Sequence, residues 1–129
     1  MPLKKLTTLS LGKNVATLGT SAFSGCTALK TVKGGKGLAT IGQTAFKGDV
    51  ALTKFTFYDK VKTIKKGAFD GCKKLATFVF KTKLLTAASV GANAFRNTGA
   101  KPAVTCPKDK KKAYSALLPK KGMSKKAKY

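Results

Sequence analysis

The sequence predicts a mainly β solenoid, in which short parallel strands from successive coils stack into a sheet. The main observation is a repeat: "ATLGTSAFSGCTALKTV" (16–32) returns as "ATIGQTAFKGDVALTKF" (39–55) and as "KTIKKGAFDGCKKLATF" (62–78), 23 residues apart. Each copy also opens a new unit on Leu and then alternates apolar with polar residues. One such unit has too little apolar surface to fold alone, so the copies are expected to stack and share one core.

The predicted strands follow from aligning the units on their leading residues, Leu6, Leu29, Leu52 and Leu75. This alignment gives about four repeats, and the fourth and sixth residues of each unit alternate toward the core. The expected inward pairs are Leu9 and Leu11, Val32 and Gly34, Phe55 and Phe57, and Phe78 and Phe80. Four such strands predict a parallel sheet with a spacing of about 4.8 Å. Gly34 lacks an apolar side chain, so the second unit is expected to be the weakest layer.

The predicted turn of each unit carries an Ala-Phe pair. Its aromatic residues are Phe23, Phe46, Phe69 and Phe95, and a glycine follows two residues after each of the first three. Glycine readily adopts the left-handed backbone of a tight turn. We therefore expect the four rings to lie one above the next in a buried column.

A period of this length with an L-x-x-L-x-L opening is typical of leucine-rich repeats. The segments "LTTLSLGKNVATLGTSAFSGC" and "LTKFTFYDKVKTIKKGAFDGC" closely resemble the BspA-like, or Treponema pallidum-type, leucine-rich repeats of bacterial surface proteins. The resemblance covers about residues 6–118 and depends on Ala-Phe-x-Gly-Cys in place of the usual Asn-based turn. The second unit departs from it, because Asp49 stands where Cys26 and Cys72 stand.

The two ends of the array differ. After a fourth unit lengthened by three residues, a short strand over 103–107 and a helix over 109–118 with Asp109 as N-cap are predicted to cover the core. The expected organisation is therefore a solenoid over 1–100, a cap over 101–118 and a flexible basic tail over 119–129. Nothing comparable covers Leu6, so we expect more repeats or a partner before it, and self-association through this end.

Charge is the outlier of the composition, with a formal net of +23 and neither His nor Glu. Such a field attracts polyanions, namely nucleic acid or anionic wall polymers. Nearly all the cations are lysines, which act as mobile point charges and do not form the planar fork of arginine. The densest cationic cluster inside the repeats is Lys60, Lys62, Lys65, Lys66, Lys73 and Lys74, the candidate polyanion patch.

Residues for catalysis or metal binding are few. Without His or Glu, the general bases reduce to four Asp, some Lys and Tyr, and no two Asp are placed as an acid/base pair. Three scattered thiols lack zinc-ligand spacing, and Cys26 and Cys72, two layers apart, are too distant for a disulfide. The glycine-rich "VKGGKGLA" (32–39) precedes no helix, so a plain turn is favoured over a phosphate loop. We expect no enzyme activity, cofactor or metal.

Binding is expected on the open face of the sheet, formed by strand residues that point away from the core. Leucine-rich repeats usually bind through this concave face, and Lys33, Lys54, Tyr58 and Lys81 are the candidate ligand-binding residues here. The resemblance implies adhesion to a protein or glycan outside the cell, on a secreted or surface protein of which this chain is a C-terminal fragment. The +23 charge supports a polyanion-binding alternative, and a structural spacer is a third reading.

Overall fold

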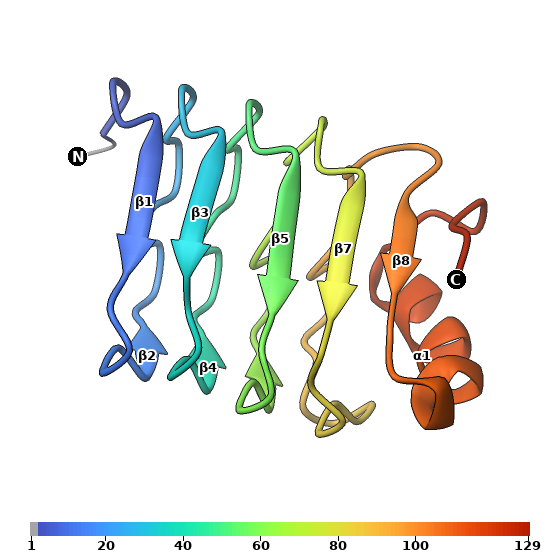
Figure 1. The fold of residues 1–129 in the computed structure, drawn as a ribbon. Helices are drawn as coiled ribbons and strands as arrows, with labels where there is room; N and C mark the ends of the chain where they lie inside the picture. Colours follow the sequence, from blue (N-terminus) through green and yellow to red (C-terminus); the bar gives the residue numbers. More distant parts are fainter. Residues whose placement is uncertain (1–2) are drawn as a thin grey trace.

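A computed structural model describes residues 3–129 as a short solenoid. The long strands β1, β3, β5, β7 and β8 stand side by side in chain order, and α1 covers the C-terminal end (Figure 1). The bounds are β1 Thr8–Leu11, β2 Thr17–Leu18, β3 Thr31–Gly34, β4 Thr40–Ile41, β5 Lys54–Phe57, β6 Thr63–Ile64, β7 Thr77–Phe80, β8 Ala103–Thr105, η1 Lys108–Lys110, α1 Lys111–Leu117 and η2 Leu118–Lys121. The predicted solenoid with a terminal strand and short helix is confirmed.

Successive coils are in parallel register at the repeat spacing. Thr8 lies opposite Thr31 and Lys54 lies opposite Thr77, so equivalent positions of neighbouring repeats pair. The two-residue strands β2, β4 and β6 form a second parallel sheet behind the first. Repeats of equal length therefore form coils of equal size. For this reason, residues at the same position of successive repeats lie next to one another in the stack.

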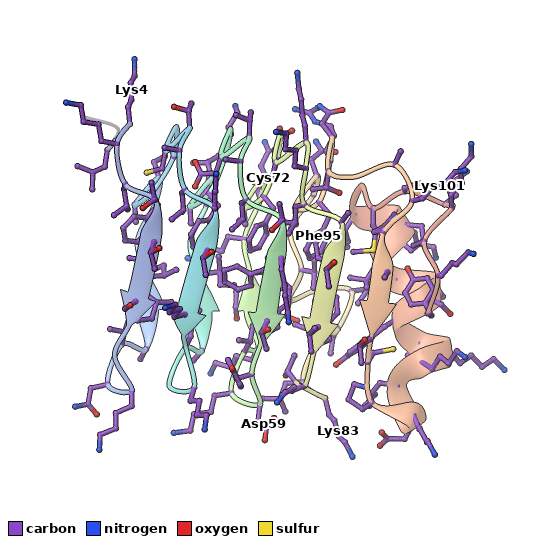
Figure 2. The ribbon with its side chains drawn as sticks, turned by 45° about the horizontal axis from the view of Figure 1, so that its top comes forward. Lys4, Asp59, Cys72, Lys83, Phe95 and Lys101 are labelled. Carbon is purple, nitrogen blue, oxygen red and sulfur yellow. The ribbon has the colours of Figure 1, made fainter. Side chains whose placement is uncertain are left out.

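The predicted column of phenylalanine rings is confirmed. Neighbouring ring centroids lie 5.9 Å apart for Phe23 and Phe46, 5.3 Å for Phe46 and Phe69, and 5.8 Å for Phe69 and Phe95, with all three pairs stacked. The last three rings are fully buried, whereas Phe23 in the first coil is half-buried. Figure 2 shows Phe95 inside the solenoid and Lys4, Lys83 and Lys101 projecting outward. Burial of successive benzyl groups therefore ties each coil to the next.

The turn after each ring has a left-handed backbone. Gly25, Gly48 and Gly71 have φ of 75°, 77° and 84°, and Asn97 takes the same place in the fourth coil with φ of 58°. Asn is the residue after Gly that most readily tolerates this region. The sequence missed Asn97 because the fourth unit lacks the glycine that marked the other turns.

The front sheet is not continuous, which corrects the prediction of one sheet. Strands β1 and β3 form one sheet, and β5, β7 and β8 form another. The inward residue at the fourth position of the unit changes from Leu9 and Val32 to Phe55 across this break. Gly34 has φ of 79°, and a Cβ there would lie 2.3 Å from the Leu11 carbonyl oxygen. The end of β3 lies close to β1, with which it pairs, and it does not pair with β5.

The C-terminal cap matches its prediction in outline and differs at its start. Tyr114 and Leu118 are fully buried against the last coil, and the Tyr114 hydroxyl donates to the Thr82 carbonyl at 2.8 Å. The Leu85 amide donates to the same hydroxyl at 3.3 Å, so the helix contacts the lengthened segment of the fourth coil. Asp109 makes no capping hydrogen bond; it lies in η1 and pairs with Lys83 at 3.3 Å. An ion pair across the loop replaces the expected N-cap.

The residues expected to form a flexible tail, 119–129, instead fold back on the cap. The backbone amide of Lys128 donates to the Pro102 carbonyl at 2.9 Å, and the Lys128 carbonyl accepts from the Val104 amide at 2.7 Å. The Met123 side chain is buried. Gly122, with φ of 101°, makes the turn that returns the chain. The high lysine content led to the prediction of a flexible tail. The lysines remain at the surface, whereas Met123 supplies the buried contact.

Candidate binding groove

The open face of the front sheet carries the residues that alternation predicted. Lys33 and Lys54 are exposed, and Thr56 and Tyr58 are half-buried, whereas the intervening Phe55 and Phe57 are buried. Strand geometry sends neighbouring side chains to opposite faces. The open face is therefore a threonine- and lysine-rich surface laid directly over an aromatic core.

A groove runs along the gap between β3 and β5. Its upper part has a volume of about 460 Å³ and its lower part about 340 Å³, and both parts are bordered by Tyr58. We call the two parts together the β3–β5 groove. Its lining residues are Lys30, Thr31, Val32, Lys33, Gly34, Thr53, Lys54, Thr56 and Tyr58 above, and Lys36, Tyr58, Asp59, Lys60 and Lys81 below. Its upper part is lined by residues of β3 and β5, the two neighbouring front strands that do not pair.

Tyr58 forms the wall between the two parts of the groove. The Lys81 ammonium lies 5.2 Å from the ring centroid, within cation–π range. A Cβ on Gly35 would lie 3.9 Å from the ring, at ordinary van der Waals distance, so Gly35 neighbours Tyr58 without crowding it. The ring thus has the Lys81 charge over it and Gly35 as a neighbour.

Three of the four predicted ligand-binding residues, Lys33, Lys54 and Tyr58, line the upper part of the groove together. Lys81 lies in the lower part beside Tyr58. Their role in binding stays a prediction. Sequence reasoning missed Lys30 and Lys36, which flank β3 and fall outside the alternation used to select open-face residues.

The candidate polyanion patch is spread around one coil. Lys60 follows the C-terminal end of β5, while Lys73 and Lys74 precede the N-terminal end of β7, so they lie at opposite ends of the strands. Lys62, Lys65 and Lys66 flank β6 in the rear sheet. Only Lys60 of the six borders the β3–β5 groove. The role of these six lysines in polyanion binding stays a prediction.

One buried carboxylate, that of Asp49, lies in the second coil without a full set of partners. Asp49 is fully buried, and its Oδ1 accepts a hydrogen bond from the Cys26 amide at 2.8 Å. Its Oδ2 has no hydrogen-bond partner. Burial raises the pKa of the Asp49 carboxyl to about 7. The Cys72 thiol donates to the Phe46 carbonyl at 3.0 Å, and burial followed by the nearby Asp49 charge raises its pKa. Cys26 and Cys72 are buried free thiols, as predicted.

A second buried carboxylate has a full set of partners. Asp70 accepts hydrogen bonds from the Arg96 guanidinium at 2.6 and 3.3 Å, so the pair links the third coil to the fourth. Two parallel N–H···O bonds of this kind fix both side chains. Asp70 thus joins neighbouring coils.

Groups for chemistry are sparse over residues 3–129. In this range, no three His, Cys, Asp or Glu side chains lie close enough together to hold a metal ion. None of the helices in the same range has the length and apolar character needed to cross a membrane. What the open face offers is lysine charge, threonine hydroxyls and backbone groups, all suited to binding.

The family profile of the BspA type leucine-rich repeat region matches residues 3–118 in six copies. The chain belongs to this family. Among solved structures, a leucine-rich repeat protein from Bacteroides ovatus is similar to it, with a TM-score of 0.66 and 22% sequence identity. The alignment covers 80% of this chain and 30% of that one, so the leucine-rich repeat chain spans about a third of its structural relative. No curated protein matches the chain.

Proposed function

We propose that this BspA-type repeat chain is a noncatalytic binding and adhesion module of a bacterial cell-surface or secreted protein. It recognises a protein or glycan through the open face of its front sheet. The observation that carries the proposal is the β3–β5 groove, because a lysine-lined hollow of about 460 Å³ in an otherwise regular solenoid offers a ligand both charge and depth. The family match supports a repeat binding module.

Substitution on the open face tests this proposal. The double variant Lys54→Ala with Tyr58→Ala removes one charge and the ring between the two parts of the groove. The control, Lys125→Ala with Lys126→Ala, changes exposed lysines of the C-terminal segment. Immobilised extracellular-matrix proteins and a glycan array serve as probes. Saturable binding that the groove variant loses and the control keeps supports adhesion; binding that both variants keep rejects the open face as its site.

Polyanion binding is the second candidate function, favoured by the net charge of +23. Neutralising phosphate or sulfate groups releases counterions, so the affinity for a single-stranded oligonucleotide must fall steeply as salt rises. Titration between low and high salt separates the two candidates. An affinity for oligonucleotide that does not change with salt would exclude this second function.

A further inference from the structure

We propose that the ligand of the β3–β5 groove is an anionic glycan, a sugar chain that carries sulfate or phosphate groups and lies along the open face of the front sheet. This inference rests on the proposed function and deepens it, because it names the ligand class of the same site. Three features of the groove support it: the lysines around both parts, the threonine hydroxyls of the upper part, and the narrow gap beneath.

Exposed lysines surround both parts of the groove. They are Lys30, Lys33 and Lys54 at the upper part and Lys36, Lys60 and Lys81 at the lower part, with Asp59 as the one acid. A hollow bordered by one sign of charge raises the local concentration of the opposite charge. Each lysine carries its ammonium on a flexible stem, so it can follow anionic groups whose spacing varies along a chain.

The two parts of the groove follow one another along the strands, so a linear ligand can contact both. The segment from Thr53 to Tyr58 spans about 20 Å at the rise of an extended strand. Lys54 stands at the upper part and Lys81 at the lower part, and Tyr58 borders both. The lysines are thus spread over a length that a chain with several anionic groups matches and a single small anion does not.

Threonine hydroxyls of the upper part supply neutral polar groups for a sugar chain. Thr31, Thr53 and Thr56 line this part. Within residues 3–129 their hydroxyls have no protein partner, whereas the Thr82 hydroxyl donates to the Val61 carbonyl at 2.6 Å. A threonine hydroxyl both donates and accepts hydrogen bonds, as a sugar hydroxyl does. The upper part therefore combines charge with the uncharged groups that a glycan needs.

The gap beneath the groove is too narrow for an added strand, which disfavours a peptide. The Cα atoms of β3 and β5 come within 8 Å of each other, whereas a strand lying between them would need about 10 Å, two strand spacings. A peptide on the open face would therefore lack the main-chain pairing that gives added strands their affinity. A glycan binds through hydroxyl and anionic groups, which the side chains of the open face can meet directly.

The groove also differs from a platform for single-stranded nucleic acid. Such platforms stack successive bases on several aromatic side chains. Among the described residues 3–129, Tyr58 is the one aromatic residue that borders the groove, and the Lys81 ammonium lies 5.2 Å from its ring centroid. One ring cannot stack a run of bases, so the groove favours charged sugars over nucleic acid.

The test is isothermal titration calorimetry with a sulfated decasaccharide, the same decasaccharide without sulfate, and a phosphorylated decasaccharide of equal charge. The groove variant is Lys33→Gln with Lys54→Gln. The matched control is Lys73→Gln with Lys74→Gln, which removes the same charge from exposed lysines outside the groove. A thymidine decanucleotide and a decaglutamate peptide serve as competing probes, and thermal unfolding checks that every variant folds.

We expect the groove variant to bind the charged decasaccharides about tenfold more weakly than the wild type, and the control less than twofold more weakly. The tighter of the two charged decasaccharides identifies the anionic group. Thr56→Val removes a hydroxyl and keeps the charge, so it should weaken glycan binding about threefold and leave decanucleotide binding unchanged.

Three results would overturn the inference while binding by the open face stands. They are equal binding of the uncharged decasaccharide, no binding of either charged decasaccharide, and tighter binding of the decanucleotide or decaglutamate with the same dependence on Lys33 and Lys54. If the groove and control variants lose affinity for every probe to the same extent, net charge alone determines binding. Both the inference and the proposed open-face site then fail.

Discussion

The front and rear of the second and third coils differ, although both are built from the same repeat. At the front, β3 and β5 do not pair. At the rear, β4 pairs with β6, and the Phe46 amide donates to the Ala68 carbonyl at 2.8 Å. The Ala-Phe-x-Gly turn is the same in both coils, whereas the strand residues change from Gly34 to Phe57. Repeat length therefore sets the coil, whereas the pairing of the front strands differs from coil to coil.

Removing a ring from the rear column should produce the largest effect. Phe69 is fully buried and stacked between Phe46 and Phe95, so Phe69→Ala should lower the free energy of unfolding by about 4 kcal/mol. Thr31→Ala, an exposed change at the front gap, should cost less than about 0.5 kcal/mol. Urea denaturation measures both. Similar costs for the two variants would mean that the column does not join the coils.

The second coil should also differ from its neighbours in its dependence on pH. The pKa of the Asp49 carboxyl is raised to about 7 in the folded state, against an ordinary value of 3.8. A raised pKa means that the folded state holds the proton more tightly than the unfolded chain. The contribution of Asp49 to the free energy of unfolding is therefore fully present below about pH 4. It is lost as the pH rises through 7, by up to roughly 4 kcal/mol.

Urea denaturation at pH 5 and pH 8 checks this dependence. Asp49→Asn should flatten the profile, because the amide oxygen can still accept from the Cys26 amide while no charge is buried. Asp109→Asn, which removes an exposed carboxylate paired with Lys83, should leave the profile as it is. A wild-type protein that becomes more stable between pH 5 and pH 8 would contradict the raised pKa.

A smaller effect is expected from adding a methyl group at the end of β3. Gly34→Ala should cost about 2 kcal/mol, because φ is 79° and the new Cβ would meet the Leu11 carbonyl. Gly48 has a similar φ of 77° and open space around it, so Gly48→Ala should cost only about 1 kcal/mol. Thermal unfolding of the two variants compares them directly. Equal costs would show that the close approach of β3 to β1 is absent.

The sequence predicted the features that depend on repetition. The ring column, the inward and outward faces and the buried thiols all follow from position in a 23-residue unit. It did not predict the gap, because Gly34 indicated a weak layer without showing that β3 and β5 would not pair. It also missed Lys30 and Lys36, whose place in the groove depends on that gap, and the folding of 119–129 onto the cap. These features arise from contacts between unlike coils, which a periodic pattern does not encode.

The protection of backbone amides on the two sides of β5 can be measured residue by residue. The amides of Lys54 and Thr56 face the gap, while the equivalent amides of Thr77 and Val79 face the paired strand β5. Native-state hydrogen exchange followed by NMR reports the two sets separately. We predict that Lys54 and Thr56 exchange at least about a hundredfold faster than Thr77 and Val79. Equal protection of all four amides would show a continuous sheet and contradict the groove.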